Sequence, residues 1–118
     1  MPTNNNYVRL EGYAGQDPEV RRLESGKLIA KVSLATTEKW INHNNQPQSR
    51  TEWHILNFWD KQAEIAAQII KKGSYISIEG KLQYNSWEDK EGRKITKAVI
   101  TVKQLTNYSQ FINQNQNA

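Results

Sequence analysis

Residues 51–73 read TEWHILNFWDKQAEIAAQIIKKG, and this stretch decides the fold class. The segment from Thr51 to Trp59 is rich in β-branched and aromatic residues, which predicts a strand. Asp60 is typical of a helix N-cap, and apolar residues then recur at helical spacing from Lys61 to Lys72. Gly73 follows as the C′ residue at which helices commonly end. We therefore expect a strand that leads directly into a helix of about three turns.

Alternation sorts the side chains of this predicted strand onto two faces. His54, Leu56 and Phe58 form a coherent inward face, and Trp53 and Trp59 share the opposite one. Packing of both tryptophans in the core is the alternative, but the inward face is already complete without them. We therefore expect the two indoles to face outward.

Four other runs alternate with period two and are bounded by Gly, Asn or Pro residues. They predict strands at residues 7–13, 27–37, 74–84 and 94–105. The resulting order is strand, strand, strand, helix, strand, strand. It predicts an all-β protein, a five-stranded OB-fold barrel with one α-helix between strands three and four. A helix at this point disfavours cold-shock and SH3-like barrels, which lack a comparable helix there.

The segments between these elements are polar. Residues 41–49, INHNNQPQS, predict a long and mobile hairpin loop, and residues 87–92 predict the charged turn of a second hairpin. The length fits one compact domain, which we place at residues 1–106. Residues 107–118 are rich in Asn and Gln and predict a short, disordered tail.

The composition argues against several classes of protein. The chain of 118 residues has no cysteine, which excludes disulfides, thiolate metal sites and thiol nucleophiles. Neither His43 nor His54 has a partner at metal-ligand spacing, and no nucleophile stands with a base. We therefore expect a non-enzymatic protein with no metal and no cofactor. No run approaches the roughly 20 apolar residues that span a bilayer, and no signal peptide is present, so we expect a cytoplasmic protein without a membrane partner.

The aromatic and basic residues indicate the class of ligand. Sixteen Lys and Arg against twelve Asp and Glu give a net charge of +4, which favours a polyanionic partner only slightly over an ordinary basic domain. Four tryptophans are more telling, because a small core rarely needs so many indoles, and unpaired bases stack on such rings beside a cationic track. We expect single-stranded nucleic acid to stack on Trp40, Trp53, Trp59 and Trp87, with its phosphates held by Arg21, Lys31, Lys39, Arg50, Lys61, Lys72 and Arg93.

Several blocks of sequence carry a resemblance to a known family. They are GYAGQDPEVR at residues 12–21, SLATTEKW at 33–40, TEWH at 51–54, KGS at 72–74 and IEG at 78–80. Together they resemble the bacterial single-stranded DNA-binding proteins over roughly residues 6–106. A match in several blocks is far more specific than any single motif.

The resemblance implies an OB fold that commonly assembles as a homotetramer, here favoured over a dimer, around which single-stranded DNA wraps. It implies protection of that DNA during replication, recombination and repair, in the bacterial cytoplasm with the nucleoid. It also implies that Trp40, Trp53 and Trp87 stack on bases, while Trp59 stands where the family usually has phenylalanine. His54 matches a histidine of the family's subunit interface.

Two departures from the family pattern limit these implications. The family usually has basic residues just before the hairpin tryptophan and after the Trp-His pair, where this chain has residues 83–86 (QYNS) and Ile55. Fewer phosphate contacts predict weaker binding and a shallower salt dependence. Each contacted phosphate contributes about −0.7 to the slope of the logarithm of the binding constant against the logarithm of the salt concentration. The acidic tip that recruits other enzymes in the family is absent from residues 113–118, so such recruitment is doubtful, and the chain is a specialised paralogue or a truncated one.

Two alternatives to a general single-stranded DNA-binding protein stay open. One is an OB-fold accessory module that acts mainly through protein–protein contacts in replication restart, which the thinned basic residues before Trp87 favour mildly. The other is an RNA-binding variant, because stacking surfaces do not distinguish ribose from deoxyribose. Tight protein binding without quenching of tryptophan fluorescence by DNA would support the first of these.

The predicted first strand suggests a test of assembly. In the family this strand pairs antiparallel with its copy in a second subunit, so Tyr7, Arg9, Glu11 and His54 are the predicted interface residues. Pairing centred near Leu10 would set Arg9 of one chain opposite Glu11 of the other, which is favourable. We expect Arg9→Glu to lower the mass of the particle in solution, as measured by light scattering. An unchanged dimer or tetramer would contradict this pairing.

Overall fold

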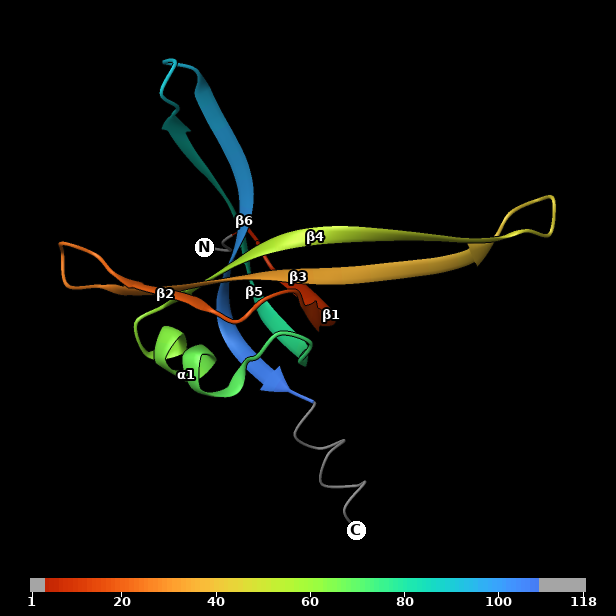
Figure 1. Ribbon diagram of the computed structural model, residues 1–118, viewed down its shortest axis with the longest axis horizontal. Helices are drawn as coiled ribbons and strands as arrows, with labels where there is room; N and C mark the ends of the chain where they lie inside the picture. The colour runs from red at the N-terminus through yellow and green to blue at the C-terminus, as the bar shows by residue number, and fades with distance from the viewer. Residues whose placement is uncertain (1–3, 109–118) are drawn as a thin grey trace, which may run out of the picture.

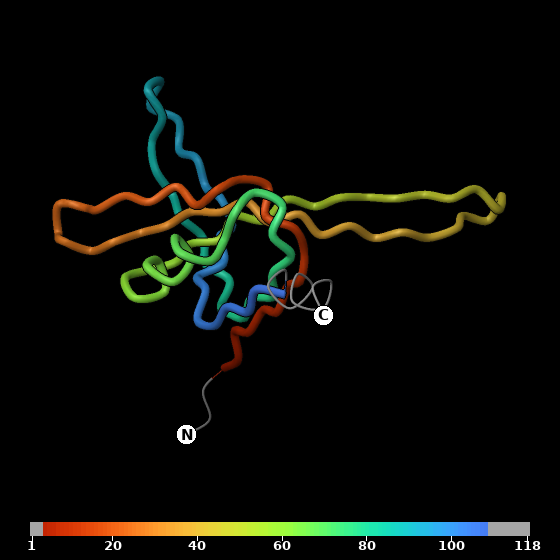
Figure 2. Tube along the Cα trace, turned by 60° about the horizontal axis from the view of Figure 1, so that its bottom comes forward, coloured from red at the N-terminus to blue at the C-terminus, as the bar shows by residue number. Residues whose placement is uncertain are grey.

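The computed structural model describes residues 4–108. In this part of the chain a β-barrel carries one helix and two long hairpins that project from it in different directions (Figure 1). The same separation of the two hairpins is visible after rotation (Figure 2). The elements are β1 (Val8–Ala14), β2 (Glu19–Arg22), β3 (Leu28–Ile41), β4 (Pro47–Trp59), α1 (Lys61–Ile69), β5 (Tyr75–Glu88) and β6 (Lys94–Asn107).

The sheet has the strand order β1-β5-β6-β4-β3-β2, and β1 also pairs with β3, which closes the barrel. The predicted all-β barrel with five main strands and one helix is confirmed. The additional strand β2 was not predicted. It pairs antiparallel with the start of β3, from Glu19 opposite Lys31 to Arg22 opposite Leu28. All four residues of β2 are exposed, so the strand leaves no alternation of apolar and polar residues in the sequence.

The core is built from the inward residues of the strands and one face of the helix. Its largest fully buried side chains are Phe58, Leu34, Leu56, Ile70, Ile76, Ile78 and Val32. The predicted inward face of β4 is therefore confirmed at Leu56 and Phe58. His54 is half-buried, and its Nε2 lies 2.8 Å from the hydroxyl oxygen of Thr36.

The predicted boundaries of the helix are wrong at the C-terminal end. The helix ends at Ile69, because Ile70 adopts an extended conformation that buries its side chain. Lys72 donates its backbone N–H to the Asp17 carboxylate at 2.8 Å and so lies outside the last helical turn. At the other end, Asp60 makes no side-chain cap bond, because its carboxylate accepts the backbone N–H of Leu28 at 3.0 Å.

The two hairpins are longer than predicted, because strand pairing continues through residues that were predicted to be loop. β3 and β4 stay paired up to Ile41 opposite Pro47. The turn between them is held by the Asn42 side chain, whose Oδ1 accepts the backbone N–H groups of Asn44 and Gln46 at 2.9 and 3.0 Å. Polar residues pair as well as apolar ones when both faces are exposed, so the polarity of this segment misled the prediction. The predicted tail at residues 107–118 begins too early, because Asn107 is the last residue of β6 and is buried; residues 109–118 lie outside the described part of the chain.

A glycine on β5 marks a close approach of two backbones within the barrel. A Cβ atom at Gly80 would stand 2.1 Å from the carbonyl oxygen of Thr101 on β6, at an irregularity in the pairing of the two strands. We expect Gly80→Ala to lower the free energy of unfolding by about 1–3 kcal/mol, because the backbone of β6 must shift. Urea unfolding measures this, with the exposed Lys103→Ala on β6 as the control. Equal stability of the two variants would contradict the close packing.

Candidate nucleic-acid interface

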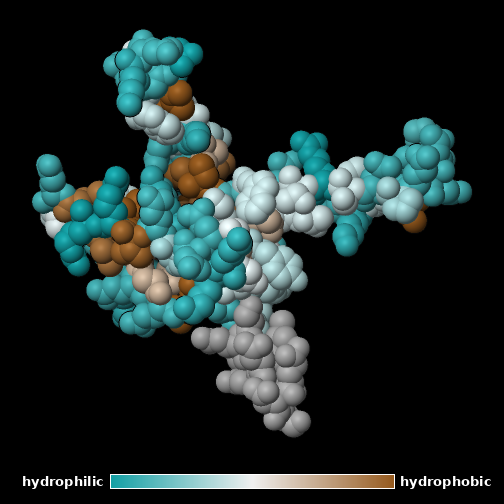
Figure 3. Space-filling model, in the orientation of Figure 1, coloured by the Kyte–Doolittle hydropathy of each residue, from teal (hydrophilic) through white to brown (hydrophobic). Residues whose placement is uncertain are grey.

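A groove forms where the outer face of β3 and β4 meets the base of the β5–β6 hairpin. Its volume is about 340 Å³. Hydrophobic residues gather where the β5–β6 hairpin meets the barrel, whereas the tips of both long hairpins are mostly hydrophilic (Figure 3). The groove is lined by Gln16, Glu19, Lys31, Val32, Ser33, Ile55, Asn57, Asn85, Trp87, Lys97 and Val99.

Strand register explains why these side chains share one surface. Lys31 pairs with Asn57 across β3 and β4, and Ser33 pairs with Ile55. Because side chains alternate along a strand, these four residues stand on the face opposite to the buried Leu56. The β3–β4 pair therefore supplies one wall of the groove.

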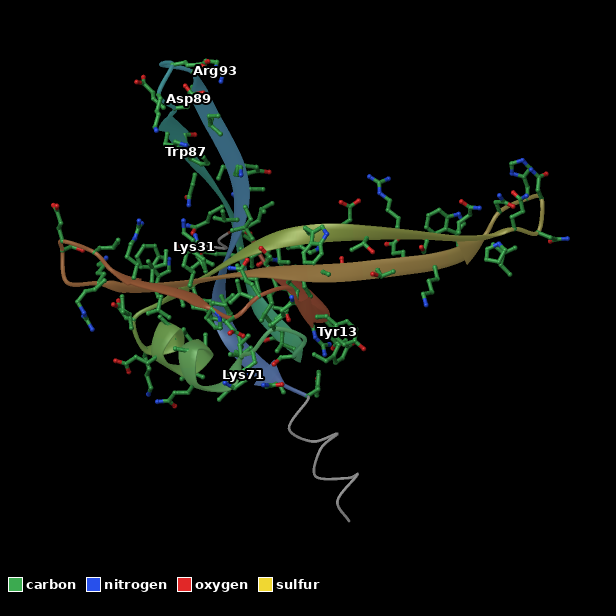
Figure 4. The ribbon with its side chains drawn as sticks, viewed as in Figure 1. Tyr13, Lys31, Lys71, Trp87, Asp89 and Arg93 are labelled. Atoms are coloured by element: carbon green, nitrogen blue, oxygen red, sulfur yellow. The ribbon has the colours of Figure 1, made fainter. Side chains whose placement is uncertain are left out.

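The β5–β6 hairpin supplies the other wall with an aromatic ring and a cation. Trp87 is 46% exposed, and the Nζ atom of Lys97 lies 5.9 Å from the centre of its ring, within reach of a cation–π interaction. Figure 4 shows Trp87 on the projecting hairpin and Lys31 nearer the barrel below it. A flat aromatic surface and two lysines therefore border the same groove.

Two further tryptophans stand on the same face of β4 as the groove. Trp53 is 61% exposed, and its six-membered ring covers Gly15, where a Cβ atom would stand 2.5 Å from it. Trp59 pairs with Ile29 at the end of β4 and is half-buried. Trp53 therefore faces outward as expected, whereas Trp59 is partly buried.

Trp40 lies apart from the other three. It stands near the tip of the β3–β4 hairpin, 45% exposed, beside a shallow hollow of about 450 Å³ that Lys39 and Pro47 also line. It pairs with Gln48, and alternation along β3 puts it on the opposite side of the ribbon from the residues that flank Trp53. Along the ribbon, Trp53 is opposite Ala35, five residues from Trp40, and is itself six residues from Trp59, so the rings are spread along β3 and β4.

Comparison with known proteins places this geometry in a family. The description of the family that matches residues 5–108 is "Single-strand binding protein family". The chain belongs to this family. It is 39% identical over 100 residues to the single-stranded DNA-binding proteins of two Neisseria meningitidis strains, one of serogroup A and one of serogroup B. These alignments cover 85% of this chain but 58% of each relative, so the chain spans less than two thirds of their length.

Solved structures of the single-strand binding family have the same fold. A Plasmodium falciparum SSB in complex with ssDNA matches with a TM-score of 0.81 at 25% identity, covering 91% of this chain and 97% of that one. A deletion mutant of the single-stranded DNA-binding protein from Thermus aquaticus matches with a TM-score of 0.75 at 24% identity, covering 87% of this chain and 50% of that one. The likeness confirms the predicted OB fold.

The predicted phosphate-binding residues fall into three groups within this family fold. Lys31 lines the groove, Arg21 stands on the same face beside it across from Ile29, and Lys39 lies beside Trp40. Arg50 and Arg93 already have acidic partners. Lys61 begins α1 and Lys72 follows it, and Figure 4 shows the adjacent Lys71 at the end of the molecule opposite to Trp87.

Both arginines of the hairpins form ion pairs with acidic side chains. The Nε atom of Arg50 lies 2.7 Å from the Glu52 carboxylate on β4. Arg93 contacts the carboxylates of Asp89 at 2.9 Å and Glu91 at 3.0 Å at the tip of the β5–β6 hairpin (Figure 4). Both arginines are largely exposed, so their ion pairs contribute little stability, but each pair lowers the net charge offered to a phosphate.

Sequence reasoning missed Lys97 and the exposed aromatic residues Tyr84 and Tyr13. Lys97 pairs with Asn85 across the hairpin and so restores a cation near Trp87, on the strand opposite to the one where the family pattern has it. Pairing the two strands outward from the turn sets Trp87 opposite Ile95 and Asn85 opposite Lys97, and this pairing would have placed Lys97 near Trp87. Tyr84 is 67% exposed on the other face of β5.

Of the predicted interface residues, Arg9 and Glu11 are exposed on β1 and Tyr7 directly precedes this strand, whereas His54 is half-buried on β4. On its second edge, β1 pairs with β3 only at Tyr13 and Ala14, and Gly12 lies close to Ala35, so among the described residues the edge from Val8 to Glu11 has no paired strand beside it. Arg9 contacts Glu11 of the same chain at 2.7 Å, and this carboxylate raises the pKa of Arg9 further above its ordinary value. A hydrogen bond with the Glu79 carboxylate raises the pKa of Tyr7.

Residues 4–108 contain neither a cluster of metal-ligating side chains nor a helix that could span a membrane. No group of three or more His, Cys, Asp or Glu side chains in this range could hold a metal ion. Nor is any helix in the described part of the chain both long and apolar enough to span a bilayer.

The turn at the tip of the β5–β6 hairpin depends on the ionised carboxylate of Asp89. Asp89 Oδ1 accepts the backbone N–H groups of Glu91 and Arg93, both at 2.9 Å. The bond from Arg93 is the main cause that lowers the pKa of Asp89 below its ordinary value of 3.8. Because the folded pKa is depressed, the contribution of this group to stability is present above pH 3.8 and is lost as the pH falls through the lower, folded pKa.

We expect the amide NMR signals of Glu91 and Arg93 to titrate together with a midpoint below pH 3.8, because both amides donate to Asp89. Asp89→Asn abolishes this titration. The matched control is the other hairpin, where the neutral Asn42 makes the same turn, so the amides of Asn44 and Gln46 do not follow it. A midpoint at or above 3.8 would contradict the assigned bonds.

Proposed function

We propose that this chain binds single-stranded DNA without strong sequence preference and protects it during replication, recombination and repair. One observation carries the proposal: Trp87, Lys97 and Lys31 border one groove, with Trp53 on the same side of the barrel. A base stacked on an exposed ring gains about 1–3 kcal/mol whatever its identity, and neighbouring cations hold the phosphates. This arrangement suits an unpaired strand, because the bases of a duplex are not free to stack on protein rings.

We infer the path of the single-stranded DNA from the elements that carry the aromatic rings and the cations. Trp87, Trp53 and the half-buried Trp59 are the stacking residues that we place on the groove side of the barrel, and a strand that reaches Trp40 near the tip of the β3–β4 hairpin has to pass to the other face of the ribbon. Lys31, Lys97 and Arg21 are the phosphate contacts that we place at the groove. The contributions of Arg50, Arg93, Lys61 and Lys72 are smaller, because the two arginines have acidic partners and the two lysines flank α1.

We further propose a non-enzymatic homo-oligomer, a tetramer rather than a dimer, that acts in the bacterial cytoplasm with the nucleoid. The unpaired edge of β1 supports assembly, since an open strand edge is a ready template for pairing with a second copy. Tyr7, Arg9, Glu11 and His54 are the residues that we place at subunit contacts. The Arg9–Glu11 pair within one chain must be exchanged or shared when two copies of β1 meet.

The test is a titration of intrinsic tryptophan fluorescence with oligo-dT at several salt concentrations. We expect strong quenching and a log–log salt slope that becomes shallower by about 0.7 in Lys97→Ala, the loss of one phosphate contact. Arg93→Ala is the matched control, because this arginine is on the same hairpin but is paired with two carboxylates, and its slope changes less.

Absence of quenching by oligo-dT would refute single-stranded DNA binding at these rings. Tight binding of a replication-restart protein by the same sample would then favour the accessory-module alternative. Stronger quenching by oligo-rU than by oligo-dT of the same length would favour the RNA-binding variant, because the groove contains polar groups that can contact a 2′-hydroxyl.

A further inference from the structure

The backbone at Asp60 has a conformation that an aspartate rarely adopts. Its φ is 50° and its ψ is −113°, close to the first central position of a type II′ turn, where glycine is usual. The other non-glycine residue with a positive φ in residues 4–108 is Asn45, in a hairpin turn that suits asparagine. Strained residues persist where their surroundings hold them, and they cluster at functional sites. Glycine would make the turn at Asp60 without strain, so the aspartate needs another reason.

The side chain of Asp60 takes the place of a backbone carbonyl group in the β3–β4 pairing. Asp60 donates its backbone N–H to the Leu28 carbonyl oxygen at 2.8 Å, and its carboxylate accepts the Leu28 N–H at 3.0 Å. In a regular ladder the Asp60 carbonyl oxygen would accept that N–H, but here it has turned into α1 and accepts the Glu64 N–H at 3.0 Å. Pairing therefore continues one residue beyond Trp59 while the helix already begins.

This last bonded pair determines how firmly Trp59 is held. Bonded and non-bonded pairs alternate along antiparallel strands, so the adjacent Ile29–Trp59 pair exchanges no backbone hydrogen bonds and its side chains stand close together. Without the carboxylate, only the N–H of Asp60 would hold the strand beyond Trp59, and weakly bonded strand ends fray. The carboxylate of Asp60 therefore completes the pairing on the far side of Trp59.

The ring of Trp59 belongs to a row of side chains that also contains a cation. Arg21 on β2 is opposite Ile29, and Ile29 is opposite Trp59, so the three side chains lie on one face of the sheet. Ile29 is 5% exposed, whereas Trp59 is half-buried and Arg21 is exposed. An aromatic ring and a guanidinium on the same face suit a base and a nearby phosphate of one strand.

We propose that Asp60 is a positioning residue, which holds the Trp59 indole in the orientation that stacks a base beside the groove. This inference rests on the proposed binding of single-stranded DNA and gives the strain at Asp60 a function. Glycine would remove the strain together with the carboxylate, so the ring would become ordered only when a base binds. Asparagine keeps an acceptor oxygen at the same place and tolerates a positive φ.

The experiment compares Asp60→Gly with Asp60→Asn, which both remove the negative charge and differ in the acceptor oxygen. We expect Asp60→Gly to bind oligo-dT about two- to tenfold more weakly than Asp60→Asn, which is the cost of ordering one freed side chain on binding. In a Trp59→Ala background the difference disappears, because no ring is left to position. Thermal unfolding checks that the variants fold, as expected because both residues tolerate the φ of 50°.

Ser74→Ala is the matched control. It removes a bond from the Lys71 N–H to the Ser74 hydroxyl oxygen at 2.9 Å, beyond the other end of α1, and leaves the dissociation constant for oligo-dT unchanged. A second measurement needs no DNA, namely the indole N–H signal of Trp59 in NMR spectra of the free chain, identified by its loss in Trp59→Ala. We expect one sharp signal in the wild type and in Asp60→Asn, and a broadened or split signal in Asp60→Gly.

Equal dissociation constants or equal indole signals in folded Asp60→Gly and Asp60→Asn would overturn the positioning role. A difference in affinity that persists in the Trp59→Ala background would also overturn it, because Asp60 would then act without the ring. Failure of the wild-type chain to bind oligo-dT, with the difference in the indole signals present, would instead refute the proposed function. The two failures are therefore distinguishable.

Discussion

The antiparallel register between β3 and β4 is the constraint on which the rest of the structure depends. It runs from Ile29 opposite Trp59 to Ile41 opposite Pro47 and sets which residues enter the core. A slip of one residue would exchange the faces, burying Lys31 and exposing Leu56. The core and the groove are two sides of the same pairing. The burial of Val32, Leu56 and their neighbours therefore also specifies where the rings and cations of the opposite face stand.

Much of this arrangement could be predicted because it repeats along the chain. The alternation around Leu56 and Phe58 marks a half-buried strand, and the helix after it distinguishes the OB fold from other small barrels. The exposed β2 could not be found, since four exposed residues leave no periodic pattern. The end of the helix was missed because Ile70 has the same hydropathy whether it faces a helix partner or leaves the helix to enter the core.

The candidate site was predictable in its residue types more than in its arrangement. The outward position of Trp53 follows from alternation, but the position of Trp40 near the tip of the β3–β4 hairpin depends on how far the hairpin extends, and polar residues do not reveal that. Lys97 shows the same limit. A basic residue moved from one strand of a hairpin to the other occupies nearly the same space, yet it is far away in the sequence. A count of the basic residues likewise overstates the number of cations that phosphates can contact, because Arg50 and Arg93 are paired with carboxylates.

The β3–β4 hairpin has a mechanical consequence. Beyond Thr36 opposite Glu52 neither strand has a third strand beside it in the described part of the chain, and every residue from Thr37 to Ile41 is exposed. A two-stranded ribbon without a core is only marginally stable, so it bends and frays far more readily than the barrel. Trp40 therefore stands on a flexible part of the ribbon. Its separation from Trp53 can change at little cost in free energy as the proposed DNA strand follows paths of different curvature.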